Sequence, residues 1–148
     1  MVVNTSDNRY GVAQLIVAPT LAEGANYTTI ATALTAASSG QTIFIRPGTY
    51  TENLTLKAGV NLTAFTDDGL TPNVTIVGTC TMTVAGTVSI SGIRLQTNSA
   101  AAIAVTGSEI SILNLDNCYL NFTNNTGISY TSSHATSVIS SPVFSWTP

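Results

Sequence analysis

The chain has 148 residues, a length that suits one domain, and only 7% of them are charged, against roughly 25% in an ordinary globular domain. Because 44% of the residues are hydrophobic, the composition excludes an intrinsically disordered chain. The net charge is −3 and the basic residues are scattered singly at Arg9, Arg46, Lys57 and Arg94, so the sequence has no basic stripe that would bind nucleic acid.

Residues 1–18 are predicted to form an N-terminal arm that ends in the apolar run VAQLIVAP, and residues 19–148 a single domain. The first residues, MVVNTSDNRYG, lack the apolar core of a secretory signal. A protein without such a signal leaves its cell by lysis, through another export system or as part of a longer chain. No apolar run approaches the ~20 residues that span a bilayer, so we expect no membrane insertion.

The segment YTTIATALTAASSG is the convincing helical pattern in the chain. Its apolar residues recur at positions i, i+3, i+4 and i+7, namely Ile30, Ala33, Leu34 and Ala37. We predict a helix over about 28–39, with Thr28 or Thr29 as its N-cap and Gly40 at its C-terminal end.

After Gly40 the apolar period changes from 3.6 residues to 2, as in Ile43 and Ile45 and then Leu54 and Leu56. The pattern predicts short, half-buried strands separated by turn residues over about 42–140, followed by a C-terminal tail over 141–148. This period occurs in β-sandwiches, β-barrels and β-solenoids alike, so it does not distinguish between these folds.

An internal repeat favours the solenoid. Shifting VSISGIRLQTNSAAAIAV by 25 residues lays it over LNLDNCYLNFTNNTGISY, with apolar residues matched at nearly every inward position. Gly92 then meets Asn117, which indicates a turn with positive φ in both copies. A looser copy starts at Val60 with a shift of 28, and a fourth begins at Val138, 25 residues after Leu113, before Pro142 interrupts it.

Repeats of this length without helices predict a parallel β-helix of about four coils. A leucine-rich repeat is the alternative, but its LxxLxLxxN spacing fits one coil only. The helix is placed to cover one end of the stack, and Phe144 and Trp146 are candidates for covering the other. The alternative to this second cap, given equal weight, is that the chain is a piece of a longer fibre. Asn117 and Asn98 are expected to form ladders between coils.

The segment YTTIATALTAASSGQTIFIRPGTYTENLTLKAGVNLTAF resembles the start of the pectinesterase-like branch of the pectin-lyase-like β-helix superfamily. The matching positions are Thr29, Ile30, Ala33, Leu34, Ile43, Ile45, Gly48, Tyr50, Glu52 and Leu54. The resemblance implies a right-handed parallel β-helix whose first corner is formed by Pro47 and Gly48. The same opening occurs in sugar-processing enzymes, in surface proteins and in phage tail proteins.

The catalytic groups of that branch are not found in this sequence, which lacks its DFIFG-like segment with paired Asp, Gln and Arg. Asp67 and Asp68 are adjacent, but they precede Gly69 and are interpreted as turn formers, with a calcium or sugar contact as the alternative. Arg94 and Asp116 are expected to face outward on adjacent coils as a surface ion pair, with a catalytic pair as the alternative.

No cofactor is expected, and the cysteines are not expected to bind a metal, because the single His134 has no partner in its Ser-rich segment. Cys80 and Cys118 lie in phase with apolar neighbours and are interpreted as buried free thiols, with a disulfide as the alternative.

These patterns favour a non-catalytic structural or receptor-binding module: a phage tail-fibre or tailspike segment, or a surface adhesin, with a glycan contact. Tyr119 and Tyr130 are the candidate stacking platforms for sugar rings, with core packing as their alternative role. A homotrimer on a virion or extracellular surface is expected, since trimerisation hides apolar surface that a thin solenoid exposes. A carbohydrate-active enzyme with a divergent or missing site and a purely architectural spacer are the alternatives.

Overall fold

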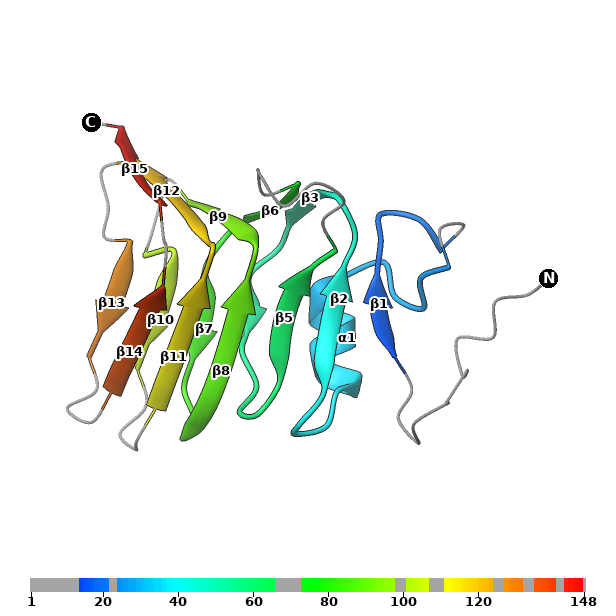
Figure 1. Cartoon of the computed structure of the whole chain (residues 1–148), viewed down its shortest axis with the longest axis horizontal. Coiled ribbons are helices and arrows are strands. Elements are labelled where there is room, and N and C mark those ends of the chain that lie inside the picture. Colours follow the sequence, from blue (N-terminus) through cyan, green and yellow to red (C-terminus); the bar gives the residue numbers. More distant parts are fainter. Residues whose placement is uncertain are drawn as a thin grey trace.

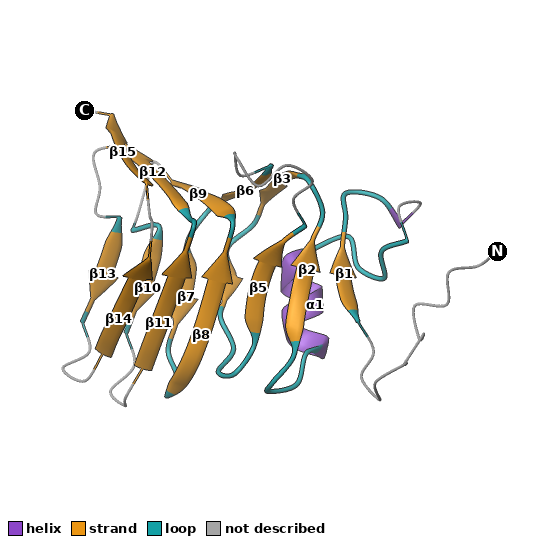
Figure 2. Ribbon diagram, in the orientation of Figure 1, coloured by secondary structure: helices purple, strands orange, loops and turns teal. Residues whose placement is uncertain are grey.

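The computed structural model describes residues 14–21, 24–65, 73–97, 101–106, 111–123, 127–131, 135–140 and 143–147. In these residues the chain winds into a parallel β-solenoid of about four turns, with one short helix near its N-terminal end (Figure 1). The predicted fold class is therefore confirmed. The coils stack side by side, and each complete coil contributes one strand to each of three sheets (Figure 2).

We name the three sheets A, B and C. Sheet A contains, in spatial order, β1 (Leu15–Val17), β2 (Thr42–Ile45), β5 (Asn61–Ala64), β8 (Gly86–Ser91), β11 (Ser111–Asp116) and β14 (Ala135–Ser140). Sheet B contains β3 (Gly48–Thr51), β6 (Val74–Val77), β9 (Ile93–Thr97), β12 (Tyr119–Thr123) and β15 (Val143–Thr147). Sheet C contains β4 (Leu54–Thr55), β7 (Cys80–Met82), β10 (Ile103–Val105) and β13 (Ile128–Tyr130).

The strand register confirms the repeat for the central coils. Val88 pairs with Leu113, and Ile103 with Ile128, at the predicted spacing of 25 residues. The looser copy is also confirmed, since Leu62 pairs with Ile90 at a spacing of 28.

The prediction for the fourth copy is wrong by one residue. Val138 pairs with Asn114 and not with Leu113, because the last coil is one residue shorter than the coil before it. A slip of one residue exchanges the inner and outer faces of a strand, so a fixed spacing of 25 does not extend to this coil. The interruption expected at Pro142 is wrong too, because β15 follows at once and pairs with β12.

The core is a set of columns formed by the inward residue of each strand. In sheet A, Leu62, Ile90 and Leu115 lie opposite one another on successive strands, and each is 0–1% exposed. Parallel ladders place equivalent residues directly over one another, so every coil buries its apolar residues against its neighbours. Most inward positions are therefore filled by Ile, Leu and Val.

Both cysteines belong to this core and are free, as predicted. Burial raises the pKa of the Cys80 thiol to about 12. Burial likewise raises the pKa of Cys118, whose thiol donates to the carbonyl oxygen of Ile90 at 3.2 Å. Both thiols are therefore held in their unreactive, protonated form.

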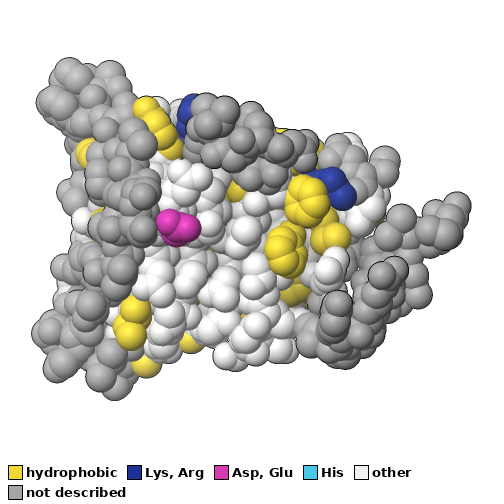
Figure 3. Space-filling model, in the orientation of Figure 1, with side chains coloured by type: hydrophobic (Ala, Val, Ile, Leu, Met, Phe, Trp, Pro, Cys, Tyr) yellow, Lys and Arg dark blue, Asp and Glu magenta, His cyan; other side chains and the backbone are white. Residues whose placement is uncertain are grey.

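The outward residues of sheet A form a polar ladder between coils. The Ser89 amide donates to the Asn61 side chain at 3.2 Å, and the Asn114 side chain donates to the Ser89 hydroxyl at 3.3 Å. Figure 3 shows this face of the molecule, on which most of the described side chains are uncharged. A ladder was expected at Asn117 and Asn98 instead. Asn98 lies outside the described residues, and Asn117 makes no side-chain hydrogen bond among them.

Asn117 has the turn role that the repeat predicted. Its φ is 49°, and the φ of Gly92 at the equivalent position of the preceding coil is 70°. Asn tolerates the left-handed region better than other side chains do, so it can replace Gly at this corner. The prediction of a positive-φ turn at both positions is confirmed.

The helix α1 (Ile30–Ala36) lies at the N-terminal end of the stack, where it packs against β1, β2 and β4 (Figure 1). Its buried residues are Ile30, Ala33 and Leu34, and Thr29 is its N-cap. The predicted C-terminal end at Gly40 is wrong: Ala37 is already extended, with a ψ of 143°, and is the C-cap. Gly40, with a φ of 90°, lies in the following turn and donates to the Gly59 carbonyl.

Two charged side chains from the segment around β4 hold the two ends of α1, and we call them the helix clamp. The carboxylate of Glu52 accepts hydrogen bonds from the amides of Ile30 and Ala31, both at 2.9 Å. The ammonium of Lys57 donates to the carbonyl oxygens of Ala37 at 2.6 Å and Thr35 at 3.4 Å. Each charge has the sign that the helix dipole favours at that end.

The first corner lies between β2 and β3, as predicted for Pro47 and Gly48. A Cβ atom on Gly48 would come within 2.8 Å of Pro19, so a larger residue does not fit there. The Tyr50 hydroxyl donates to the Arg46 carbonyl oxygen at 2.9 Å and holds the corner. Leu15–Val17, which the sequence assigned to the arm, form β1, so sheet A begins before residue 19.

Phe144 and Trp146 were expected to cover the C-terminal end of the stack. Their side chains lie outside the described part of the structure, so this stays a prediction.

Candidate functional site

The outer face of sheet B brings together the chain's best candidates for ligand contact. Along β9 the inward Ile93 and Leu95 alternate with the outward Arg94 and Gln96. Parallel pairing then aligns the outward residues of neighbouring strands: Arg94 lies between Thr75 and Tyr119, and Gln96 lies between Val77 and Asn121.

Arg94 and Tyr119 form the central contact of this face. The guanidinium carbon of Arg94 lies 4.9 Å from the centroid of the Tyr119 ring, within the range of a cation–π interaction. The Nε atom of Arg94 is buried and has no hydrogen-bond partner among the described residues. We call this pair the Arg94–Tyr119 platform.

A second pair of the same kind occurs at the corner between sheets A and B. Arg46 follows β2, and its guanidinium carbon lies 4.9 Å from the centroid of Phe65, which follows β5 in the next coil. Phe65 is 42% exposed, and the Nε atom of Arg46 is buried without a hydrogen-bond partner in the described part of the chain. In both pairs an arginine of one coil therefore contacts an aromatic ring of the following coil.

The chemistry of the platform suits a polyhydroxylated ligand. A tyrosine ring offers an apolar face together with a polar hydroxyl, and a guanidinium group offers several planar donors. Gln96 and Asn121 add amide donors and acceptors beside the pair, and Gln96 is exposed. Sugars present both apolar C–H faces and hydroxyl groups, which this combination can contact.

The structure places the residues that the sequence predicted as ligand or metal contacts in different parts of the chain. Tyr119 is half-buried on the outer face of sheet B, whereas Tyr130 ends β13 in sheet C and pairs with Val105. The two tyrosines are therefore on different sheets, and the side chain of Tyr130 is not among those described. The pair Asp67 and Asp68 lies outside the described residues, so the proposed calcium or sugar contact there stays a prediction.

The ion pair expected between Arg94 and Asp116 is wrong. Asp116 ends β11, where it pairs with Ser91, while Arg94 pairs with Tyr119 on another sheet. Both side chains are described, and the structure has no ion pair between them. The corner at Asn117 and Cys118 lies between Asp116 and sheet B and directs the two side chains to different faces.

The described acids do not gather around the platform. The Glu52 carboxylate is bound to the amides of α1, and Asp116 is exposed at the end of its strand. Within the described ranges, no group of three or more His, Cys, Asp or Glu residues could hold a metal ion. In the same part of the chain, no helix is long and apolar enough to cross a membrane.

Neither arginine–aromatic pair was predicted from the sequence, in which Arg46 was interpreted as an isolated cation and Arg94 as the partner of Asp116. The signal for one pair was present, because the 25-residue shift lays Tyr119 directly over Arg94. Phe65 gave no such signal, because the coil that precedes it is shorter: Thr42 pairs with Asn61 at a spacing of 19.

Comparison with known proteins yields no relative: no family model, no curated protein and no solved structure matches this chain.

Proposed function

We propose that the chain is a non-catalytic β-solenoid module that presents a glycan-binding face, as in a phage tail fibre or tailspike or in a surface adhesin. The observation that carries the proposal is the Arg94–Tyr119 platform with Gln96 and Asn121 beside it. The resemblance of the opening segment to pectin-lyase-like proteins supports the same class, because that scaffold recurs among proteins that handle sugars.

The proposal includes a homotrimer on a virion or extracellular surface. The large hydrophobic side chains exposed among the described residues include Leu21 (59%) and Phe65 (42%). Contacts between copies would bury such surface. Light scattering across a concentration series tests this part: a mass three times the 15.3 kDa of the chain supports it, and a constant mass of one chain overturns it.

The glycan contact is tested by incubating the purified protein with an array of bacterial and animal surface glycans, followed by calorimetric titration of the glycans retained. We expect Tyr119→Ala and Arg94→Ala each to weaken binding at least about tenfold, because each removes one half of the platform. Thr81→Ala, an outward substitution on sheet C, is the matched control and leaves binding unchanged.

The same experiment distinguishes the alternatives. An array that retains nothing overturns the glycan contact and favours an architectural spacer. Shortened or deacylated glycan products in the titration cell would instead favour the carbohydrate-active enzyme. If Thr81→Ala loses as much binding as the two platform variants, the glycan site is not on sheet B.

A further inference from the structure

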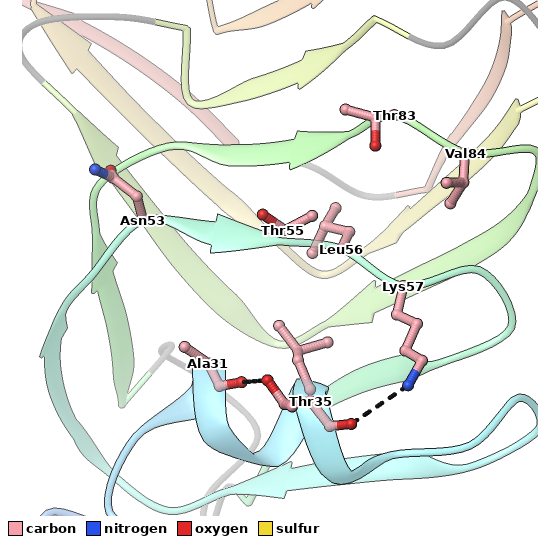
Figure 4. A pocket seen from close by; sticks show the side chains of 9 residues that line it. Ala31, Thr35, Asn53, Thr55, Leu56, Lys57, Thr83 and Val84 are labelled. Carbon is pink, nitrogen blue, oxygen red and sulfur yellow. Dashed lines mark hydrogen bonds between the residues drawn. The ribbon is translucent and has the colours of Figure 1, made fainter.

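A groove lies between α1 and the strand that packs beside it, on a different sheet from the Arg94–Tyr119 platform. It has a volume of about 450 Å³, and its walls come from α1, from the segment 53–57 and from Thr83 and Val84, which follow β7 (Figure 4). This volume is within the range of about 300–1,000 Å³ that holds small ligands in proteins. The groove has no assigned role in the solenoid fold or in the proposed glycan contact.

One wall of the groove is the unpaired edge of sheet C. In β4 and the residue that follows it, the amides of Leu54 and Leu56 donate to the carbonyl oxygens of Thr79 (2.9 Å) and Thr81 (2.8 Å) in the next coil. Residues alternate in a parallel ladder, so the N–H and C=O groups of Thr55 point away from β7, toward α1. Neither group has a partner among the described residues. The edge therefore offers one main-chain donor and one acceptor.

The side chains around this edge are uncharged with one exception. Lys57 is the charged residue of the lining, and it donates two of its three N–H bonds to carbonyl oxygens at the end of α1. The third N–H remains for a ligand. The apolar part of the lining includes Val84, whose side chain is 46% exposed, beside the hydroxyl group of Thr83.

We propose that the groove binds the C-terminal end of an extended peptide, which adds to sheet C as a strand parallel to β4 and places its carboxylate at Lys57. Main-chain groups on an open strand edge are complementary to those of another strand, which is how peptides bind by β-augmentation. β4 runs toward Lys57, and the described strand pairs are all parallel. A peptide with the same direction therefore ends at the ammonium group, where charge complementarity favours its carboxylate. Val84 provides an apolar contact for one of its side chains.

The probe is acetyl-Thr-Val-Thr-Val with a free C-terminal carboxylate, titrated into the full ¹⁵N-labelled chain and followed by NMR. We expect the amide of Thr55 to move downfield and its hydrogen exchange to slow, with shifts also at Lys57 and Val84. The same peptide with an amidated C-terminus is expected to bind at least about tenfold more weakly. Equal affinity for the amide overturns the role of Lys57.

Two variants test the groove itself. Thr55→Pro removes the edge donor while leaving the ladder to β7 intact, since that ladder does not use the Thr55 amide. Thr83→Arg obstructs the groove from an exposed position, and Thr131→Arg, exposed on sheet C after β13, is its matched control. We expect at least a tenfold loss of peptide binding in the first two variants and none in the control.

Unchanged binding in both groove variants, or the absence of shifts with either peptide at millimolar concentration, overturns the proposal. Shifts at Thr55 produced by a neutral disaccharide and not by the peptide overturn it as well. The outcome is independent of the glycan experiment, because the residues involved lie on sheet C and α1 rather than on sheet B.

Discussion

Substituting Glu52 with glutamine isolates the contribution of the helix clamp. The carboxylate oxygens of Glu52 accept the amides of Ile30 and Ala31, which are among the unpaired N–H groups at the start of α1. Glutamine keeps the length and the planar shape of the side chain. It loses the negative charge, and its NH₂ group replaces one of the two acceptors.

The size of the effect follows from these two losses. A hydrogen bond to a charged group contributes about 1.5–3 kcal/mol, and a negative charge at a helix N-terminus contributes about 0.3–1 kcal/mol. Glu52 is only partly buried, so the low end of both ranges applies and the expected loss is about 2 kcal/mol. With about 2.1 cal/mol/K of unfolding entropy per residue, a chain of 148 residues should then melt about 6 °C lower.

The assay combines calorimetry with hydrogen exchange. The melting temperature reports the global loss, and faster exchange at the Ile30 and Ala31 amides reports the local one. Asp116→Asn is the matched control, because it removes one negative charge from an exposed strand end and is expected to change stability by less than about 0.5 kcal/mol. A Glu52 variant that melts within 1 °C of the parent, with the two amides still protected, would refute the reasoning.

Three further outcomes are expected. Ile90→Ala opens a cavity between Leu62 and Leu115 and should lower the free energy of unfolding, measured with urea, by about 2–5 kcal/mol; a loss below 1 kcal/mol would mean that the core column collapses around the gap. At the left-handed corner, Asn117→Gly should be neutral in the same assay while Asn117→Val costs about 1–2 kcal/mol, and equal stability of the two contradicts the backbone argument. Stability should fall as pH rises from 9.0 toward about 12, because unfolding lets Cys80 lose a proton that the native state retains; if Cys80→Ala has the same pH slope, the thiol is not its source.

The sequence predicted those features that repeat from coil to coil. The alternation of apolar residues and the 25-residue shift identified the solenoid and the partners of Val88 and Ile103, because parallel strands align equivalent positions. The matched Gly92 and Asn117 predicted a turn with positive φ for the same reason. These predictions needed no knowledge of distant contacts.

Features set by one coil alone were not predictable in this way. The last coil is one residue shorter, so Val138 took a different partner from the one expected. The end of α1 is fixed by Lys57, which is 20 residues from Ala37 in the sequence, and not by the nearby Gly40. The Arg46–Phe65 pair depends on a contact between coils of unequal length, which alternation along a single strand does not reveal. The Arg94–Tyr119 pair follows the 25-residue shift, but the shift alone does not show that the two side chains are in contact.

The helix clamp also has a consequence for the order in which the chain folds during synthesis. Its hydrogen bonds join groups 20 to 22 residues apart, so α1 and the β4 segment can meet once residue 57 has left the ribosome. Each later coil then needs only the coil before it as a template, because its strands pair with that neighbour. Growth from the capped end therefore follows the direction of translation, and at each stage the growing end of the stack is the newest coil.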